Sequence, residues 1–116
     1  MQSEILQKNI AEHALGAIKG KENRAVFLNF LLSITADCDC FNVKNMPRIV
    51  KDIGIMASND PVALDQASYD LVNKAAGLED AFKHEAGISG LPCLEYSQKI
   101  GLGTRKYKLT EITAAK

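Results

Sequence analysis

The sequence predicts a single α/β domain over residues 1–116, built on a small, mostly buried sheet flanked by helices. Two apolar runs, residues 25–34 and 52–58, contain few polar breaks and are typical of buried strands. Segments with helical spacing lie on either side of them, and such alternation indicates an α/β fold. A chain of 116 residues that is 47% hydrophobic has the usual size and composition of one domain.

Composition and charge exclude several functional classes. Fourteen basic and fourteen acidic side chains give a formal net charge of zero, so no overall field attracts the chain to nucleic acid or to an anionic membrane. No apolar run has the length of a membrane span, and the first residues do not resemble a secretory signal. Of three cysteines, two are one residue apart, where a disulfide would be strained, so we expect a reducing, cytoplasmic location.

The first half of the chain predicts one helix and one strand. Residues 3–18 form an amphipathic helix whose apolar stripe is Leu6, Ile10, Ala14 and Ala17. Residues 25–34 are almost continuously apolar, which is typical of a central strand covered by helices on both faces.

The second half begins with the strand over residues 52–58. Asp60 and Pro61 then favour a helix start, because aspartate caps free amides and proline suits the first helical position. This helix extends to about residue 76 with Gly77 as its C-cap, and shorter helices follow over residues 79–85 and 93–100. Residues 107–112 alternate and predict a half-exposed edge strand, in a sheet of about three to five strands.

A dense chemical cluster, Asp37-Cys38-Asp39-Cys40, follows the first strand. In an extended backbone Cys38 and Cys40 point to the same side and form a pair of thiolate ligands. Zinc or iron needs four ligands in a closed site, or three and a water in a catalytic one. The predicted metal ligands are Cys38, Cys40, Asp52 and Asp60, and any bound metal is expected to be a zinc or iron ion.

Other interpretations of the same residues stay open. Asp37, Asp39, His13, His84 and Cys93 are further candidate ligands, and the sequence does not choose among them. Cys38 and Cys40 are equally well explained as small buried side chains, and a redox pair is a third alternative. If these residues have purely structural roles, His13 lies in the core or a helix interface, His84 is exposed and Cys93 is a packing residue.

The start of the helix at Pro61 is also a candidate ligand site. A helix N-terminus at the carboxyl end of a strand attracts anions in open α/β folds. The candidate ligand-binding residues are Ser58, Asp60 and Asp65. Capping alone would also explain Asp60, and Asp65 is expected to face water.

Five stretches resemble the domain of unknown function 362 family, whose members are often described as iron–sulfur centre proteins. They are Ala11-Glu12-His13-Ala14, Cys38-Asp39-Cys40, Asp52-Ile53-Gly54-Ile55, the nine residues from Ala57 to Asp65, and the seven residues from Gly101 to Tyr107. The resemblance covers residues 11–112. It implies that Cys38, Cys40, Asp52, Ser58, Asp60 and Asp65 are shared polar positions, whereas His13 replaces an expected aromatic residue.

The resemblance further implies that the chain is the C-terminal half of a longer architecture. Three cysteines cannot supply a complete iron–sulfur cluster alone. The implied partners are a missing N-terminal half, a ferredoxin-like domain or a second copy of the chain, with no nucleic acid and no membrane.

Three functional hypotheses follow. The first is a metal-associated α/β module related to iron–sulfur centre proteins, with the Cys-x-Cys loop as its metal site. The second is an enzyme half-domain that binds a small anionic substrate at the Asp60-Pro61 helix start and uses acids for proton transfer. The third is a structural or assembly unit whose site is completed by a partner. The sequence contains no complete phosphate loop and no clear nucleophile–base pair, so enzymatic activity is left open.

Overall fold

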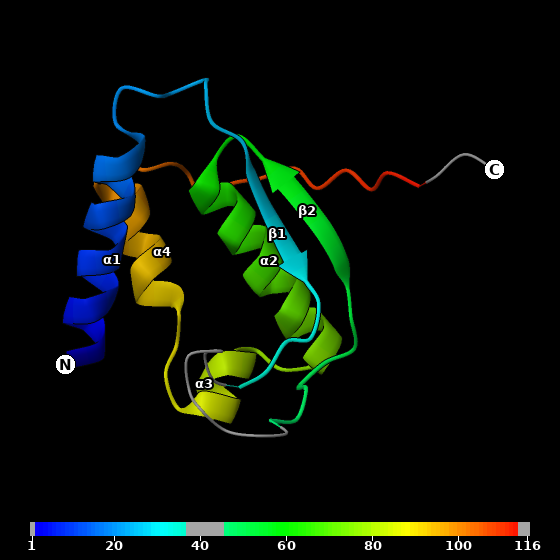
Figure 1. Ribbon diagram of the computed structural model, residues 1–116. Helices are drawn as coiled ribbons and strands as arrows, with labels where there is room; N and C mark the ends of the chain where they lie inside the picture. The colour runs from blue at the N-terminus through cyan, green and yellow to red at the C-terminus, as the bar shows by residue number, and fades with distance from the viewer. Residues whose placement is uncertain (1, 37–45, 114–116) are drawn as a thin grey trace.

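The computed structural model describes residues 2–36 and 46–113, and it confirms the α/β class (Figure 1). The elements in chain order are α1 (Gln2–Ile18), β1 (Phe27–Leu31), β2 (Gly54–Ser58), α2 (Pro61–Ala76), α3 (Ala81–Ala86) and α4 (Leu91–Lys99). Figure 1 shows α1 and α4 side by side, α2 crossing behind both strands, and α3 at the far end of α2. No helix in the described ranges is long and apolar enough to cross a membrane.

The sheet of the described chain has two antiparallel strands, with Phe27 opposite Ser58 and Leu31 opposite Gly54. Helix α2 covers one face, where Asn29 donates a hydrogen bond to the hydroxyl of Ser68 on α2 (3.0 Å). The other face carries the cross-strand pairs Phe30–Ile55 and Leu28–Ala57, and it is exposed. The cover on both faces predicted for residues 25–34 is therefore absent among the described residues, because α1 and α4 pack against each other instead.

The backbone segment that follows β1 and the one that precedes β2 continue side by side as an irregular ribbon. Gly54 has φ 149°, which favours glycine, and the ladder is interrupted there. The amide of Ile53 still donates to the carbonyl of Leu31 (2.8 Å). Thr35 and Arg48 then form an isolated antiparallel bridge. The ribbon thus leads directly to the connection that contains Cys38 and Cys40, which lies outside the described residues.

Two buried clusters, each with residues of α2, form the core of the described chain. Val62, Tyr69 and Leu94 make one buried cluster, and Val50, Val72 and Ala81 make the other. Phe82 packs against both clusters and stacks on Tyr69 with ring centroids 5.7 Å apart. Because both clusters include residues of α2, this helix is the scaffold on which the sheet, α3 and α4 are arranged.

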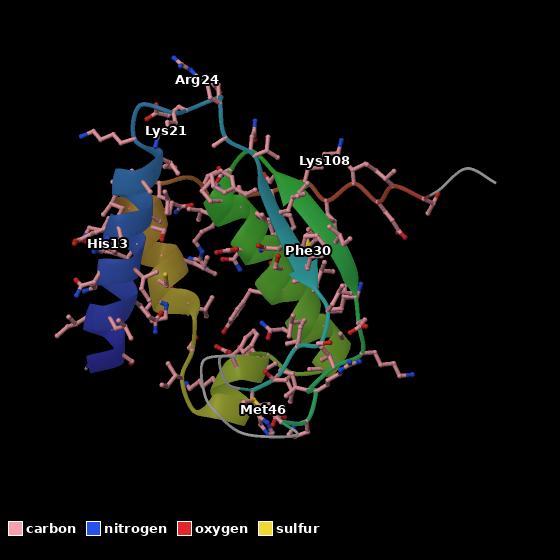
Figure 2. All side chains as sticks on the ribbon, in the orientation of Figure 1. His13, Lys21, Arg24, Phe30, Met46 and Lys108 are labelled. Carbon is pink, nitrogen blue, oxygen red and sulfur yellow. The ribbon has the colours of Figure 1, made fainter. Side chains whose placement is uncertain are left out.

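Helix α1 has the predicted extent but buries a different face. Leu6 and Ile10 of the predicted apolar stripe are 60% and 53% exposed, whereas Ala11 is 1% exposed. Gln7 fixes the packing on α4, because its side-chain oxygen accepts from the amide of Cys93 (2.9 Å). The core or interface position expected for His13 is wrong, since this side chain is exposed on α1 (Figure 2).

The edge strand predicted for residues 107–112 is not formed. The hydroxyl of Tyr107 donates to the carboxylate of Asp70 on α2 (2.6 Å), which holds the segment against the helix instead of against a strand. Residues 108–113 are exposed and have no hydrogen bond within the described chain. The described sheet therefore has two strands instead of the expected three to five.

Candidate functional site

Asp60 caps α2, as the sequence predicted. One carboxylate oxygen, Oδ1, accepts from the amides of Val62 (2.9 Å) and Ala63 (3.0 Å). The hydroxyl of Ser58 accepts from the amide of Asp60 (3.0 Å), and the Asp60 carbonyl accepts from Leu64 (3.0 Å). The amides of the first helical turn that would bind an anion are thus already engaged by a carboxylate.

The second oxygen of Asp60 binds a distant segment. Oδ2 accepts from the amide of Thr104 (3.0 Å), 44 residues further along the chain. The backbone at Gly103 approaches so closely that an added Cβ would lie 2.1 Å from Oδ1 of Asp60. Glycine is therefore required at position 103, which gives the Gly101-Leu102-Gly103 motif a structural meaning that a turn alone does not explain.

We call residues 103–107 the strap, because they fasten the C-terminal segment along α2. The Nε of Arg105 donates to Gln66 (2.8 Å), and Gln66 donates to Asp70 (2.9 Å). Asp70 also accepts from Tyr107, so Asp60, Gln66 and Asp70 bind the strap along the helix. Sequence reasoning missed the roles of Gln66 and Asp70, because nothing in the local pattern links α2 to residues so far away.

The hydrogen bond to Asp70 is the largest cause that raises the pKa of Tyr107 to about 12, followed by burial and the Asp70 charge. The phenol is neutral when it donates, so the folded state holds this proton more tightly than the unfolded state. Its contribution to stability is therefore present below the ordinary pKa of 10.0 and is lost as the pH rises towards about 12.

We expect the free energy of unfolding to fall more steeply between about pH 10 and pH 12 in the parent chain than in Tyr107→Phe, because the variant has no phenol to titrate. The difference should stay below about 1 kcal/mol, since the side chain is partly exposed. Urea unfolding of both proteins across this pH range measures it. Equal slopes would show that Tyr107 is not held by Asp70 in solution.

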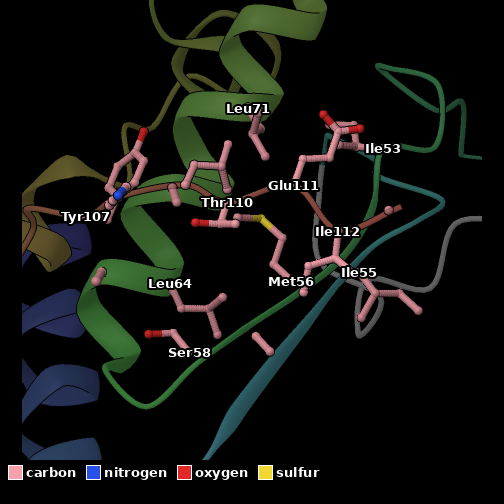
Figure 3. Close-up of a pocket in the computed structure, with 16 residues that line it drawn as sticks. Ile53, Ile55, Met56, Ser58, Leu64, Leu71, Tyr107, Thr110, Glu111 and Ile112 are labelled. Carbon is pink, nitrogen blue, oxygen red and sulfur yellow. The ribbon is translucent and has the colours of Figure 1, made fainter. Parts of the chain in front are cut away.

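A groove of about 730 Å³ lies beside the strap (Figure 3). Strand β2 and one side of α2 form two of its walls, and residues 107–112 form the third. Figure 3 shows Met56, Leu64 and Leu71 inside it, with Thr110 and Ile112 on the opposite wall. Among the described residues that line the groove, the titratable ones are Tyr107, Lys108 and Glu111.

Asp52 and Asp60 cannot bind the same ion. They flank opposite ends of β2, whose five residues span about 13 Å in an extended strand. Asp52 is exposed and lies at the ribbon, where it accepts from the amide of Ser33 (2.8 Å) and stands 3.8 Å from Arg48. Of the two acids, only Asp52 is at the end of the sheet from which the Cys-x-Cys connection departs.

The other predicted ligands are not brought together. Cys38, Cys40, Asp37 and Asp39 lie outside the described residues, so their role stays a prediction. His13, His84 and Cys93 are on three different helices, α1, α3 and α4, and His84 is exposed as expected. In the ranges that the structure describes, no group of three or more His, Cys, Asp or Glu side chains could hold a metal ion.

Asp65 is exposed, as expected, but it is not free of contacts. Its Oδ1 accepts from the side-chain amide of Asn29 on β1 (2.8 Å), and the same amide group donates to Ser68 (3.0 Å). Ser68 in turn donates to the carbonyl of Leu64 (2.8 Å). Asp65 thus helps to join α2 to the sheet on the side of β1, away from the strap.

A second polar network at the start of α3 was not predicted. Asp80 accepts from the hydroxyl of Ser89 (2.6 Å) and from the amide of Lys83 (3.0 Å), while Tyr69 contacts Ser89 (3.3 Å). Burial acts to raise the pKa of Asp80, but hydrogen bonds from Ser89, Tyr69 and Lys83 outweigh it and leave the pKa below its ordinary value. The network caps α3 and closes the turn before α4.

A family model described as "Domain of unknown function (DUF362)" matches residues 1–70. No curated protein and no solved structure matches the chain. The matched region includes Cys38, Cys40, Asp52, Ser58, Asp60 and Asp65, and it ends at Asp70, before the strap. Because the match covers more than half of the 116 residues, the chain belongs to this family of unknown function.

Proposed function

We propose that the chain is an assembly module that pairs with a second copy through the outer face of its sheet, and that the pair holds one zinc or iron ion. The observation that carries this proposal is the exposed apolar face itself, formed by Val26, Leu28, Phe30, Leu32, Ile55 and Ala57. The first five are between 42% and 74% exposed. Apolar patches of this kind mark interaction sites on soluble proteins.

The face suits a second copy because it is apolar and uncharged. In a two-fold dimer the same patch meets itself, so a charged patch would repel its copy whereas this one does not. Full burial of one such side chain contributes about 1.5–3 kcal/mol, and complete burial of the exposed parts on two copies would contribute about 9–18 kcal/mol. Association costs about 4–15 kcal/mol, so the face supports a weak, concentration-dependent dimer.

The metal part of the proposal follows from ligand number. The Cys-x-Cys motif offers two thiols per chain, and the described residues add no cluster of ligands. Two copies offer four thiols, which is the ligand set of a closed tetrahedral zinc or iron site. A two-fold axis parallel to the strands would bring the matching ends of both ribbons together, and the Cys-x-Cys connection leaves from those ends.

Elemental analysis by inductively coupled plasma mass spectrometry tests the metal. After anaerobic purification and reconstitution we expect about half an equivalent of zinc or iron per chain, as required by four thiolates from two chains. Cys38→Ser and Cys40→Ser should each lose it, whereas Cys93→Ser, the matched control, should retain it. If the parent chain bound no metal, the metal part of the proposal would be wrong.

Sedimentation velocity tests the interface. We expect the sedimentation coefficient of the parent chain to rise with concentration and that of Phe30→Asp to stay at the monomer value, because a carboxylate at the centre of the face would meet its copy. Ile10→Asp, at an equally exposed position on α1, is the matched control and should dimerise normally. A parent chain that stays monomeric at every concentration, or two variants that behave alike, would contradict the proposed face.

One observation favours a second candidate, a metal site within a single chain. Asp52 contacts Ser33 and Arg48 on the ribbon that leads to the Cys-x-Cys connection, which favours it as a third ligand beside Cys38 and Cys40. This site would give about one metal per chain, and Asp52→Asn would reduce it. In the dimer, Asp52→Asn would leave the metal content at half an equivalent. The helix start at Asp60 supports no anion site, because its amides are engaged.

A further inference from the structure

A hollow of about 290 Å³ lies on the side of α2 away from the strap. It is bordered by β1, α2, α3 and α4, and its walls are mostly apolar. The apolar wall residues are Leu31, Ile34, Val72, Phe82 and Leu94. None of them belongs to the outer face of the sheet or to the predicted metal site, so the hollow is separate from the function proposed above.

Among the described residues that line the hollow, Asp65 is the one acid, and none is Lys, Arg or His. The described chain provides no ion-pair partner for Asp65, whose Oδ1 accepts only from the neutral amide of Asn29 (2.8 Å). The hollow thus combines a hydrocarbon wall with one carboxylate that lacks a cationic partner.

The remaining polar groups of the hollow are already hydrogen-bonded or carry no charge. The hydroxyl of Ser68 donates to the Leu64 carbonyl (2.8 Å), and the hydroxyl of Tyr69 contacts Ser89 (3.3 Å). Burial, with a smaller effect of the Asp65 charge, raises the pKa of Cys93, so this thiol adds no second negative charge at neutral pH. Asp65 is therefore the charged group among the described residues that line the hollow.

From this charge complementarity we infer that the hollow binds a small apolar primary amine. The ammonium group would bind the Asp65 carboxylate, and the hydrocarbon part would lie on Leu31, Val72 and Leu94. The hollow, of about 290 Å³, suits a small ligand. An anion of the same size would be repelled by Asp65, and a neutral ligand would form no ion pair with it.

The test uses two probes of equal length, hexylamine and hexan-1-ol, titrated at neutral pH and low salt. Methyl NMR signals of Leu31, Val72 and Leu94 report binding. We expect both probes to shift these signals and the amine to bind about three- to fivefold more tightly, the preference that one exposed ion pair provides. Signals that do not shift saturably, or equal affinity for both probes, would overturn the inference without the need for any variant.

Two variants then test whether the preference for the amine comes from the Asp65 carboxylate. In Asp65→Asn the preference for the amine should fall to about one, because the amide keeps the shape of the side chain and removes its charge. In Glu79→Gln, which removes an exposed carboxylate outside the hollow, the preference should remain. An amine preference that persists in Asp65→Asn would overturn the assignment to Asp65 and with it the inference.

Discussion

Replacement of Asp60 by alanine should lower the free energy of unfolding by about 2–4 kcal/mol, one of the two largest effects that we expect in this chain. The variant loses the cap on the amides of Val62 and Ala63, and it also leaves the amide of Thr104 without its acceptor. Urea unfolding followed by circular dichroism measures the change.

Two further variants, one at an exposed position and one at the capping position, serve as comparisons for Asp60→Ala. Asp65→Ala, on the same helix, removes one exposed hydrogen bond and should cost less than about 1 kcal/mol. Asp60→Asn should fall between the two alanine variants, because its oxygen can still cap α2 but its amide group cannot accept from Thr104. If Asp60→Ala cost no more than Asp65→Ala, the strap would not be fastened at the helix start.

Gly103→Ala should destabilise the chain by about 1–3 kcal/mol, although it adds only a methyl group. That carbon would lie 2.1 Å from a carboxylate oxygen held by backbone amides, so either the strap or the cap must move. Gly16→Ala in α1 is a control of opposite sign. No atom lies within 4 Å of its added Cβ, and alanine should stabilise the helix by about 0.5–1 kcal/mol.

A double-mutant cycle separates this clash from a general loss of stability. In the Asp60→Ala background the carboxylate is gone, so Gly103→Ala should cost at least about 1 kcal/mol less than in the parent chain. Simple additivity of the two costs would mean that the glycine is required for another reason.

The start and end of α2 could be predicted because their causes are local. Asp60 and Pro61 begin the helix and Gly77 ends it with a left-handed φ of 67°, and each acts on amides or carbonyls within a few residues. The two strands were located for a similar reason, since a dense apolar run is visible without knowledge of its neighbours. Local chemistry therefore gave the class of the fold and the cap at Asp60.

The remaining features depend on partners that are distant in sequence. The alternation at residues 107–112 is that of a strand, but one hydrogen bond from Tyr107 to Asp70, 37 residues away, fixes the segment on α2. The apolar stripe of α1 was misplaced because Gln7 packs on α4 through polar bonds that hydrophobic periodicity does not register. An apolar run likewise does not tell which face of a strand a helix will cover.

The residues of the candidate site also divide into those with local causes and those with distant partners. Asp52 and Asp60 are eight positions apart in the sequence and both looked available to Cys38 and Cys40. The extended strand between them separates the two carboxylates, so that one belongs to the ribbon and the other to the cap of α2. The spacing was visible in the sequence, but the hydrogen bond from the Thr104 amide to Asp60 was not.

The strap has a consequence for biosynthesis. The ribosome makes α2 before it makes Thr104, so for that interval one oxygen of Asp60 has no strap to bind. At about 5–20 residues per second, that interval lasts a few seconds. The nascent domain therefore passes through a stage in which the scaffold helix has been synthesised but its Gln66 and Asp70 side chains have not yet met the strap.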